Sequence, residues 1–422
     1  MFRSPAARAL RRTIAVPAAE TKTRCLNTLT RPSIRSKLAG QSYLKAQGRR
    51  TFASQDSVWT RCKQLYHRHP YQVSLAGVII LFASGCIVYA NYLYQSYIIA
   101  SFHKYPEPVA QKLRRALYYT NTDLQPKEAL KYYKQALEIA NELGMDPFSD
   151  EIIGVKIQVA ALMERINNFP KAIEVLEILK RDMLNWEELL GGLERNKQKR
   201  TRVLKQAIAV SVKLGELYSN PYVQDPKTAE ERLVWAVETT LREKARREKA
   251  NVNSEEEGEW MDDNEIGASL EALAHNYEEQ DKHYLATPLF LQALSLKPTQ
   301  DCHSVTLMNN LSISLAQQNP PASLIAQGEA PPSRKALVAN ATQWAEKAIQ
   351  VAAGITPPVR DEECDYACAV ALHNLGEFAE MNNNVKEARS KYREAISLAK
   401  GLGFQEGLDN SSEALRRVTK AG

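Results

Sequence analysis

The side chains that could do chemistry in this chain are few and widely spaced. None of its seven histidines stands in the HxxxH or HExxH spacing that sets two imidazoles on one helix face for a metal ion. The sequence also holds no glycine-rich phosphate loop and no G-x-S-x-G motif. It therefore predicts no catalytic or metal site and no cofactor, and enzymatic activity is not expected.

Two of the six cysteines, Cys364 and Cys368, are four residues apart, which is one helical turn. Such a pair could act in redox chemistry or ligate a metal ion, because thiolates do both. The cysteines as a set show no CxxC spacing for zinc and no dense disulfide framework. We interpret Cys364 and Cys368 as ordinary thiols near the start of a helix, with a redox or metal pair as the alternative.

Helical periodicity recurs from residue 105 to the end at a spacing near 34 residues. The clearest unit, 267–298, has small residues at its positions 8, 20 and 27 and large ones at 4, 7, 11 and 24. Small residues let two antiparallel helices approach, and large ones fill the space between neighbouring pairs. The residues of this pattern are Leu270, Leu273, Ala274, Tyr277, Ala286, Phe290 and Ala293, with Pro298 at the end. They match the tetratricopeptide repeat (TPR) signature.

Other units follow the same register, the strongest of them starting at Ala369 and near Leu214. The sequence therefore predicts an all-α fold, a TPR-type helical-hairpin solenoid of about six repeats over 105–422. A helix near Gly407–Val418 is expected to cap it.

Three insertions interrupt the array, at about 185–205, 251–265 and 319–334. The first is expected to lengthen a helix and carries a basic cluster. The second holds seven acidic residues and is expected to be a disordered loop.

The first helices of TPR arrays line the concave face, and the side chains expected there in this chain lean acidic. The candidates for a peptide-binding groove are Glu271, His275, Glu278, Glu279, His373, Asn374, Glu377 and Glu380. TPR proteins that clamp the carboxylate end of a chaperone use a lysine and an asparagine of one repeat together. No repeat here has both, so that kind of ligand is disfavoured.

An uncharged apolar run, Val73–Ala90, can extend to residue 94 and is long enough to cross a bilayer. Tyrosines flank it on both sides, as in the aromatic belts of membrane spans. The basic residues Arg61, Lys63 and Arg68 precede it, which places segment 53–72 on the positive-inside side. A buried core helix is the alternative. The sequence thus predicts one transmembrane helix over 73–94 with 53–72 in the mitochondrial matrix, if the chain lies in the inner membrane.

The N-terminal arm, residues 1–52, carries twelve Lys or Arg and a single acid, Glu20. It lacks the apolar core of a secretory signal, so a mitochondrial presequence fits better than a retained basic tail. The stretch "RTFAS" resembles a processing-peptidase site with Arg50, Phe52 and Ala53 around the cut after Phe52. The net charge of +6 resides in this arm, since residues 106–422 carry −8. An acidic array argues against nucleic acid as a partner.

A presequence, one span and then a TPR array resemble the fungal TPR substrate adaptors of the i-AAA protease in the mitochondrial inner membrane. The stretch "SFHKYPEPVAQKLRRALYYT" after the span adds to this resemblance. The resemblance implies a non-catalytic subunit that recruits unfolded or misassembled membrane proteins to the i-AAA protease complex and its other adaptor subunit. It also implies a matrix N-terminus and a TPR domain in the intermembrane space. A TPR assembly scaffold and a mitochondrial import receptor are the alternatives.

Overall fold

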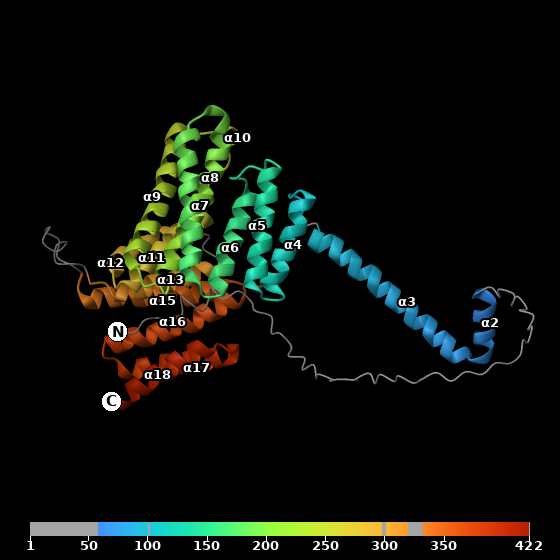
Figure 1. Cartoon of the computed structure of the whole chain (residues 1–422). Helices are drawn as coiled ribbons and strands as arrows, with labels where there is room; N and C mark the ends of the chain where they lie inside the picture. The colour runs from blue at the N-terminus through green and yellow to red at the C-terminus, as the bar shows by residue number, and fades with distance from the viewer. Residues whose placement is uncertain (1–57, 100–101, 298–300, 320–331, 422) are drawn as a thin grey trace, which may run out of the picture. The chain divides into compact units, whose positions relative to one another are not determined.

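A computed structural model of the chain describes residues 58–99, 102–297, 301–319 and 332–421. All regular elements in these residues are helices (Figure 1). The chain divides into two compact units between Pro106 and Glu107. The presequence, its expected cleavage site at Arg50, Phe52 and Ala53, and residues 320–331 of the third insertion lie outside the described residues.

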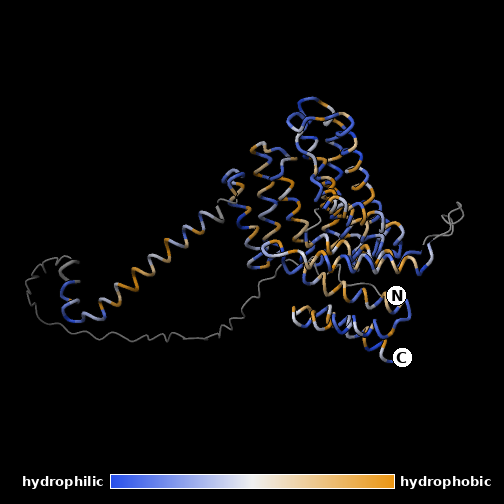
Figure 2. The backbone as a smooth tube through the Cα atoms, turned by 180° about the vertical axis from the view of Figure 1, so that it is seen from behind, coloured by the Kyte–Doolittle hydropathy of each residue, from blue (hydrophilic) through white to orange (hydrophobic). Residues whose placement is uncertain are grey.

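The described part of the N-terminal unit is built around one long apolar helix. Helix α2 (Val58–Arg68) leads into α3 (Pro70–Leu93), which continues as a π-helical turn, η1 (Tyr94–Ile99). The stretch Pro70–Ser96 is long and apolar enough to cross a membrane, since its 27 residues reach about 40 Å. Its large apolar side chains are exposed, and Figure 2 shows the apolar stretch running along α3. The predicted span 73–94 lies within the stretch Pro70–Ser96.

The second unit is a row of six helical hairpins closed by a single helix. The hairpins are α4 (Glu107–Asn121) with α5 (Pro126–Glu142), α6 (Asp150–Arg165) with α7 (Phe169–Leu190), α8 (Lys197–Tyr218) with α9 (Pro226–Ala250), α11 (Asp263–Glu279) with α12 (His283–Ser295), α13 (Cys302–Ala316) with α15 (Arg334–Gly354), and α16 (Glu362–Met381) with α17 (Val385–Leu402). Helix α18 (Gln405–Ala421) packs on α17 and closes the row. The predicted fold of about six repeats and a capping helix is confirmed.

The repeat signature explains how each hairpin closes. In the fourth hairpin, Ala274, Ala286 and Ala293 are fully buried where α11 and α12 meet, as their small size requires. Phe290 is also fully buried, in a core shared with Leu307 and Leu311 of α13. Each hairpin therefore completes its core with the next one, which is how a solenoid gains stability.

Two glycines mark the closest approaches between helices. A Cβ added at Gly215 would lie 2.4 Å from Leu233 Cγ, and one at Gly376 would lie 2.6 Å from Tyr392 Cε1. Both glycines therefore allow a large side chain of the second helix to pack directly on the backbone of the first.

The first insertion lengthens two helices rather than one. Helices α7 and α8 reach 22 residues each and are joined through the 3-10 turn η3 (Glu194–Asn196). Two of its basic side chains pair with acids of the array: Arg200 Nε lies 2.7 Å from Glu187 of α7, and Lys199 Nζ lies 2.7 Å from Asp146 in the loop before α6. These two basic residues therefore make contacts within the array.

The expectation of a disordered acidic loop over 251–265 is wrong. The segment forms a short helix, α10 (Ser254–Glu257), and ends in a capping box of Asp262 and Glu265 that begins α11. Arg247 of α9, only 10% exposed, donates hydrogen bonds to the Gly258 carbonyl (2.8 Å) and to Glu243 (3.0 Å). The acidic composition pointed to a solvated loop, but arginines of α9 hold the segment in place.

Replacing Arg247 with alanine is expected to loosen this segment without unfolding the array. The change leaves Glu243, whose side chain is 6% exposed, with fewer donors and frees the Gly258 carbonyl. Losing a partner of a buried charge costs about 2 kcal/mol, which is roughly thirtyfold in local opening. Hydrogen exchange of the amides in 253–260 measures it. The matched control is Arg242→Ala, because Arg242 is 77% exposed on the same helix; equal exchange in both variants would contradict the assignment.

Candidate functional site

A continuous chain of carboxylates and imidazoles joins the first helices of the last three hairpins. On α11, Glu271 lies between two histidines: its Oε1 is 3.3 Å from His275 Nε2, and its Oε2 is 2.9 Å from His303 Nε2 on α13. The other nitrogen of His303, Nδ1, is 2.9 Å from Glu363 Oε1 on α16. His275 Nδ1 ends the chain 3.0 Å from Glu278. We call these five residues the acid–imidazole chain.

Pairing with carboxylates keeps the two imidazoles of this chain charged, against the effect of burial. Burial opposes charging of His275, but its hydrogen bonds to Glu271 and Glu278 outweigh it and raise its pKa to about 9. The hydrogen bonds from His303 to Glu271 and Glu363 raise the pKa of His303 to about 10. Burial of Glu271 is likewise outweighed by its two histidine partners, which hold its pKa well below the usual range. At neutral pH His275 and His303 are therefore imidazolium ions, and Glu271 between them is a carboxylate.

The predicted groove residues of the fourth unit are therefore largely brought together. Glu271, His275 and Glu278 belong to the acid–imidazole chain, whereas Glu279 is exposed at the end of α11. The glutamates of this face are paired with imidazolium ions. The face is therefore less acidic than the sequence predicted.

Sequence reasoning missed His303 and Glu363. Both precede the first position of their repeats, in the N-terminal turns of α13 and α16. They are 32 and 92 residues from Glu271 in the chain, so no local spacing links them to it. Only the stacking of the hairpins reveals this connection.

The predicted groove residues of the last unit are covered by the capping helix. Glu380 accepts hydrogen bonds from Arg417 of α18 at 2.7 and 3.1 Å and from the Tyr392 hydroxyl at 3.0 Å. His373 Nδ1 lies 3.0 Å from the Ser411 hydroxyl of α18, and its Nε2 lies 3.5 Å from Glu377. The side chains that would face a seventh repeat thus contact α18 instead.

Asn374 does not line an open face. It is 1% exposed and is buried in the hairpin core, because position 6 of this repeat faces inward. Asn309, at the preceding repeat position in the fifth hairpin, is also buried, and it donates to the Ala367 carbonyl at 2.8 Å. Burial makes both asparagines unavailable to a ligand.

The interpretation of Cys364 as an ordinary thiol is wrong. Cys364 forms a disulfide with Cys302, 62 residues earlier, which joins the first turns of α13 and α16. The alternative pairing with Cys368 is not made either: Cys368 is a free, half-buried thiol, and burial raises its pKa. The pairing depends on how two hairpins stack, so spacing within one helix could not reveal it.

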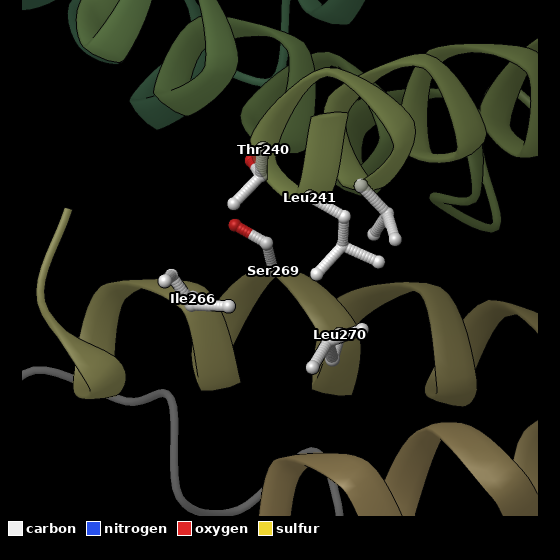
Figure 3. A pocket seen from close by; sticks show the side chains of 6 residues that line it. Thr240, Leu241, Ile266, Ser269 and Leu270 are labelled. Carbon is white, nitrogen blue, oxygen red and sulfur yellow. The ribbon is translucent and has the colours of Figure 1, made fainter. Parts of the chain in front are cut away.

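A small open depression lies between α9 and α11 (Figure 3). Its empty volume is about 120 Å³, and it is lined by Val237, Thr240, Leu241, Ile266, Ser269 and Leu270. Its two hydroxyls donate to backbone carbonyls of their own helices, at 2.8 Å for Thr240 and 3.2 Å for Ser269. Small-molecule sites usually enclose 300 Å³ or more, so this hollow is a packing feature.

The stability of the array is expected to fall as the pH rises from about 6.5 to about 10. A histidine whose pKa is raised by folding stabilises the fold fully below its unfolded pKa, and this contribution is lost as the pH passes its folded pKa. For His275 and His303 those folded values are about 9 and about 10. The lowered pKa of Glu271 acts at the acid end, where its contribution is lost as the pH falls below about 4.5. The rise of the His275 pKa alone, from 6.5 to about 9, corresponds to a loss of about 3 kcal/mol above pH 6.5.

Urea unfolding at several pH values checks this expectation. The difference between wild type and His303→Ala should be largest near pH 6.5 and should shrink toward pH 10. His67→Ala, on α2 outside the array, serves as the control. A difference between wild type and His303→Ala that does not change with pH would contradict a charged His303.

Comparison with known proteins gives a relative that is described as a TPR repeat-containing protein. No protein-family model matches the chain. A TPR repeat-containing protein of Schizosaccharomyces pombe is 28% identical over 378 residues, which cover 87% of this chain and 93% of the relative. A Saccharomyces cerevisiae protein described as MRG3-like is 27% identical over 119 residues, 27% of this chain and 25% of that protein.

Among solved structures, BtubC of P. vanneervenii is 14% identical with a TM-score of 0.41, over 70% of this chain and 91% of BtubC. A STAND signal-transduction ATPase with a tetratricopeptide repeat sensor, from Pyrococcus horikoshii, is 16% identical with a TM-score of 0.38, over 82% of this chain and 47% of that one. Likenesses this distant carry no argument about function.

Proposed function

We propose that this protein is a membrane-anchored, non-catalytic TPR adaptor that binds unfolded or misassembled inner-membrane proteins and delivers them to the i-AAA protease. The observation that carries the proposal is the order of parts: one apolar helix that is long enough to span a membrane, followed by a six-hairpin solenoid. A solenoid offers an extended surface for a protein partner. Anchoring it beside a membrane raises its effective concentration toward membrane-bound partners.

The choice of the i-AAA protease and of its other adaptor subunit rests on the resemblance in organisation. The proposed location is the inner membrane, with the N-terminus in the matrix and the TPR array in the intermembrane space. The Cys302–Cys364 disulfide supports a compartment more oxidising than the cytosol, where thiols are kept reduced. The basic flank of the span supports this orientation.

The row of first helices is the proposed binding surface. The acid–imidazole chain offers carboxylate acceptors at partly exposed positions, because both N–H groups of each imidazole are already used within the chain and the side chains are between 16% and 32% exposed. An unfolded segment presents unpaired backbone N–H groups, which can donate to the remaining lone pairs of these carboxylates. Helix α18 covers the last hairpin, so we place the bound segment on the hairpins before it.

Turnover of inner-membrane protease substrates tests the proposal. Cells without the protein should degrade unassembled inner-membrane subunits more slowly, and the wild-type chain should restore their half-lives. Glu278→Lys should restore them incompletely, because it places a like charge beside His275. Glu346→Lys, an exposed site on the second helix α15, is the matched control. Unchanged half-lives without the protein would favour an assembly scaffold.

Protease accessibility tests the proposed orientation separately. Protease added to mitochondria with ruptured outer membranes should digest residues 107–422, and intact mitochondria should protect them. Digestion in intact organelles would indicate a cytosolic array, as in an import receptor.

A further inference from the structure

Three potential metal ligands converge where α13 and α16 begin. Cys302 Sγ, Cys364 Sγ and a carboxylate oxygen of Asp361 all lie within 4.8 Å of one another. The two cysteines are buried and Asp361 is exposed, so the group lies at the edge of the core and opens toward solvent. The two sulfurs are bonded to each other, at 2.00 Å, with the two Cα atoms 4.7 Å apart. The same residues would present two free sulfurs if that bond were reduced.

The position of both cysteines favours their thiolate forms. Cys302 is the first residue of α13, and Cys364 is the third residue of α16. The partial positive charge of a helix N-terminus attracts an anion such as a thiolate. Thiolates are also the form that ligates soft and borderline metal ions. Two helix ends therefore act on the same pair of sulfurs.

Asp361 is held in place as a third ligand. It is the N-cap of α16, and its Oδ1 accepts hydrogen bonds from the Glu363 amide at 3.0 Å and the Cys364 amide at 3.4 Å. Both bonds use the same oxygen, so Oδ2 keeps its lone pairs. The carbonyl oxygen of Val359 lies 3.7 Å from Cys302 Sγ and adds a further oxygen on this side.

We propose that the reduced form of this site binds one Zn²⁺ ion through Cys302, Cys364 and Asp361. A thiol reductant opens the site: two reductant thiols give one reductant disulfide, and the protein disulfide becomes two thiols. Binding of Zn²⁺ then displaces the two thiol protons, and water or the Val359 carbonyl fills the fourth position. In the zinc-bound form the two sulfurs would lie about 3.8 Å apart, the separation of two thiolates around a tetrahedral zinc ion, and rotation of the two side chains would separate them.

The disulfide and the zinc ion are then alternative links between the same two helices. Either one joins the first turns of α13 and α16, next to the ion pair of His303 with Glu363. The array would thus keep this link in both reducing and oxidising surroundings. This inference is independent of the partner proposed above, since it concerns only residues within the array.

Cobalt binding to the full-length chain in detergent micelles tests the site. The chain is reduced with a phosphine, which is removed before titration with Co²⁺, a spectroscopic probe for zinc sites. We expect one Co²⁺ per chain, a thiolate-to-cobalt charge-transfer band, and loss of that band on adding Zn²⁺. The oxidised chain should give no band.

Three variants locate the ligands. Cys302→Ser should abolish the band or reduce it to that of a single thiolate, and Asp361→Asn should weaken affinity by about tenfold or more while leaving both sulfurs in place. Cys368→Ser should behave as wild type, because that thiol lies outside the site. Absence of the band in the reduced wild-type chain would overturn the proposal. So would a full band in Cys302→Ser, an unchanged affinity in Asp361→Asn, or loss of the band in Cys368→Ser.

Discussion

Replacing Phe290 with alanine is expected to lower the free energy of unfolding of the array by about 4 kcal/mol. The Phe290 ring is fully buried in the core that joins the third, fourth and fifth hairpins. Removing it leaves a cavity that stacked helices on both sides can fill only by shifting. Because each hairpin is stabilised by its neighbours, the loss should also weaken the fifth hairpin, through Leu307 and Leu311.

Urea unfolding of the full-length chain, followed by tryptophan fluorescence, measures this effect. The next residue, Leu291, gives the matched control, because it is 42% exposed on the same helix. Leu291→Ala should cost less than about 1 kcal/mol. Equal losses for the two variants would show that α12 does not pack as described.

Reduction of the Cys302–Cys364 disulfide, with a chelator present to remove metal ions, should cost about as much. The bond closes a loop with a sequence separation of 62 residues, and a loop of that length restricts the unfolded chain by about 4 kcal/mol. The urea midpoint of the wild-type chain should therefore fall when reductant is added. The urea midpoint of Cys364→Ser should not respond to reductant.

Cys368→Ser controls for the remaining thiol of the array. It should retain the wild-type response, since Cys368 is not part of the bond. A wild-type midpoint that does not respond to reductant would mean that the two cysteines are not linked in the folded chain.

The fold was predictable because the TPR signature is local. Small residues such as Ala274 and Ala286, and large ones such as Phe290, recur at fixed positions of the repeats. Their sizes determine how a hairpin closes. The apolar span was predictable for the same reason: length and lack of charge are properties of one segment.

The features that escaped prediction depend on contacts between hairpins. The partners of Glu271 include His303 in the next hairpin, which in turn contacts Glu363 in the one after that. The order of segment 253–260 depends on Arg247 of α9. The composition of the segment itself could not reveal that contact. The partner of Cys364 was hidden for the same reason. Register within a repeat can be read from the sequence, whereas contacts between repeats need the stacked structure.

The position of α18 also changes how the last hairpin is interpreted. The expected groove residues His373 and Glu380 follow the repeat pattern, but a capping helix occupies the place where the next repeat would stack. Capping helices satisfy the polar groups of the final repeat and prevent further stacking. The surface proposed for partners therefore lies on the hairpins before α16.

We propose that this chain joins unfolded inner-membrane proteins to an AAA protease, and affinity purification of the tagged full-length chain from mitochondria in mild detergent can test this role. We expect the i-AAA protease to co-elute with the wild-type chain, together with unassembled membrane proteins that increase when proteolysis is blocked. Recovery of the chain with an assembled respiratory complex, and without any AAA protease, would contradict it.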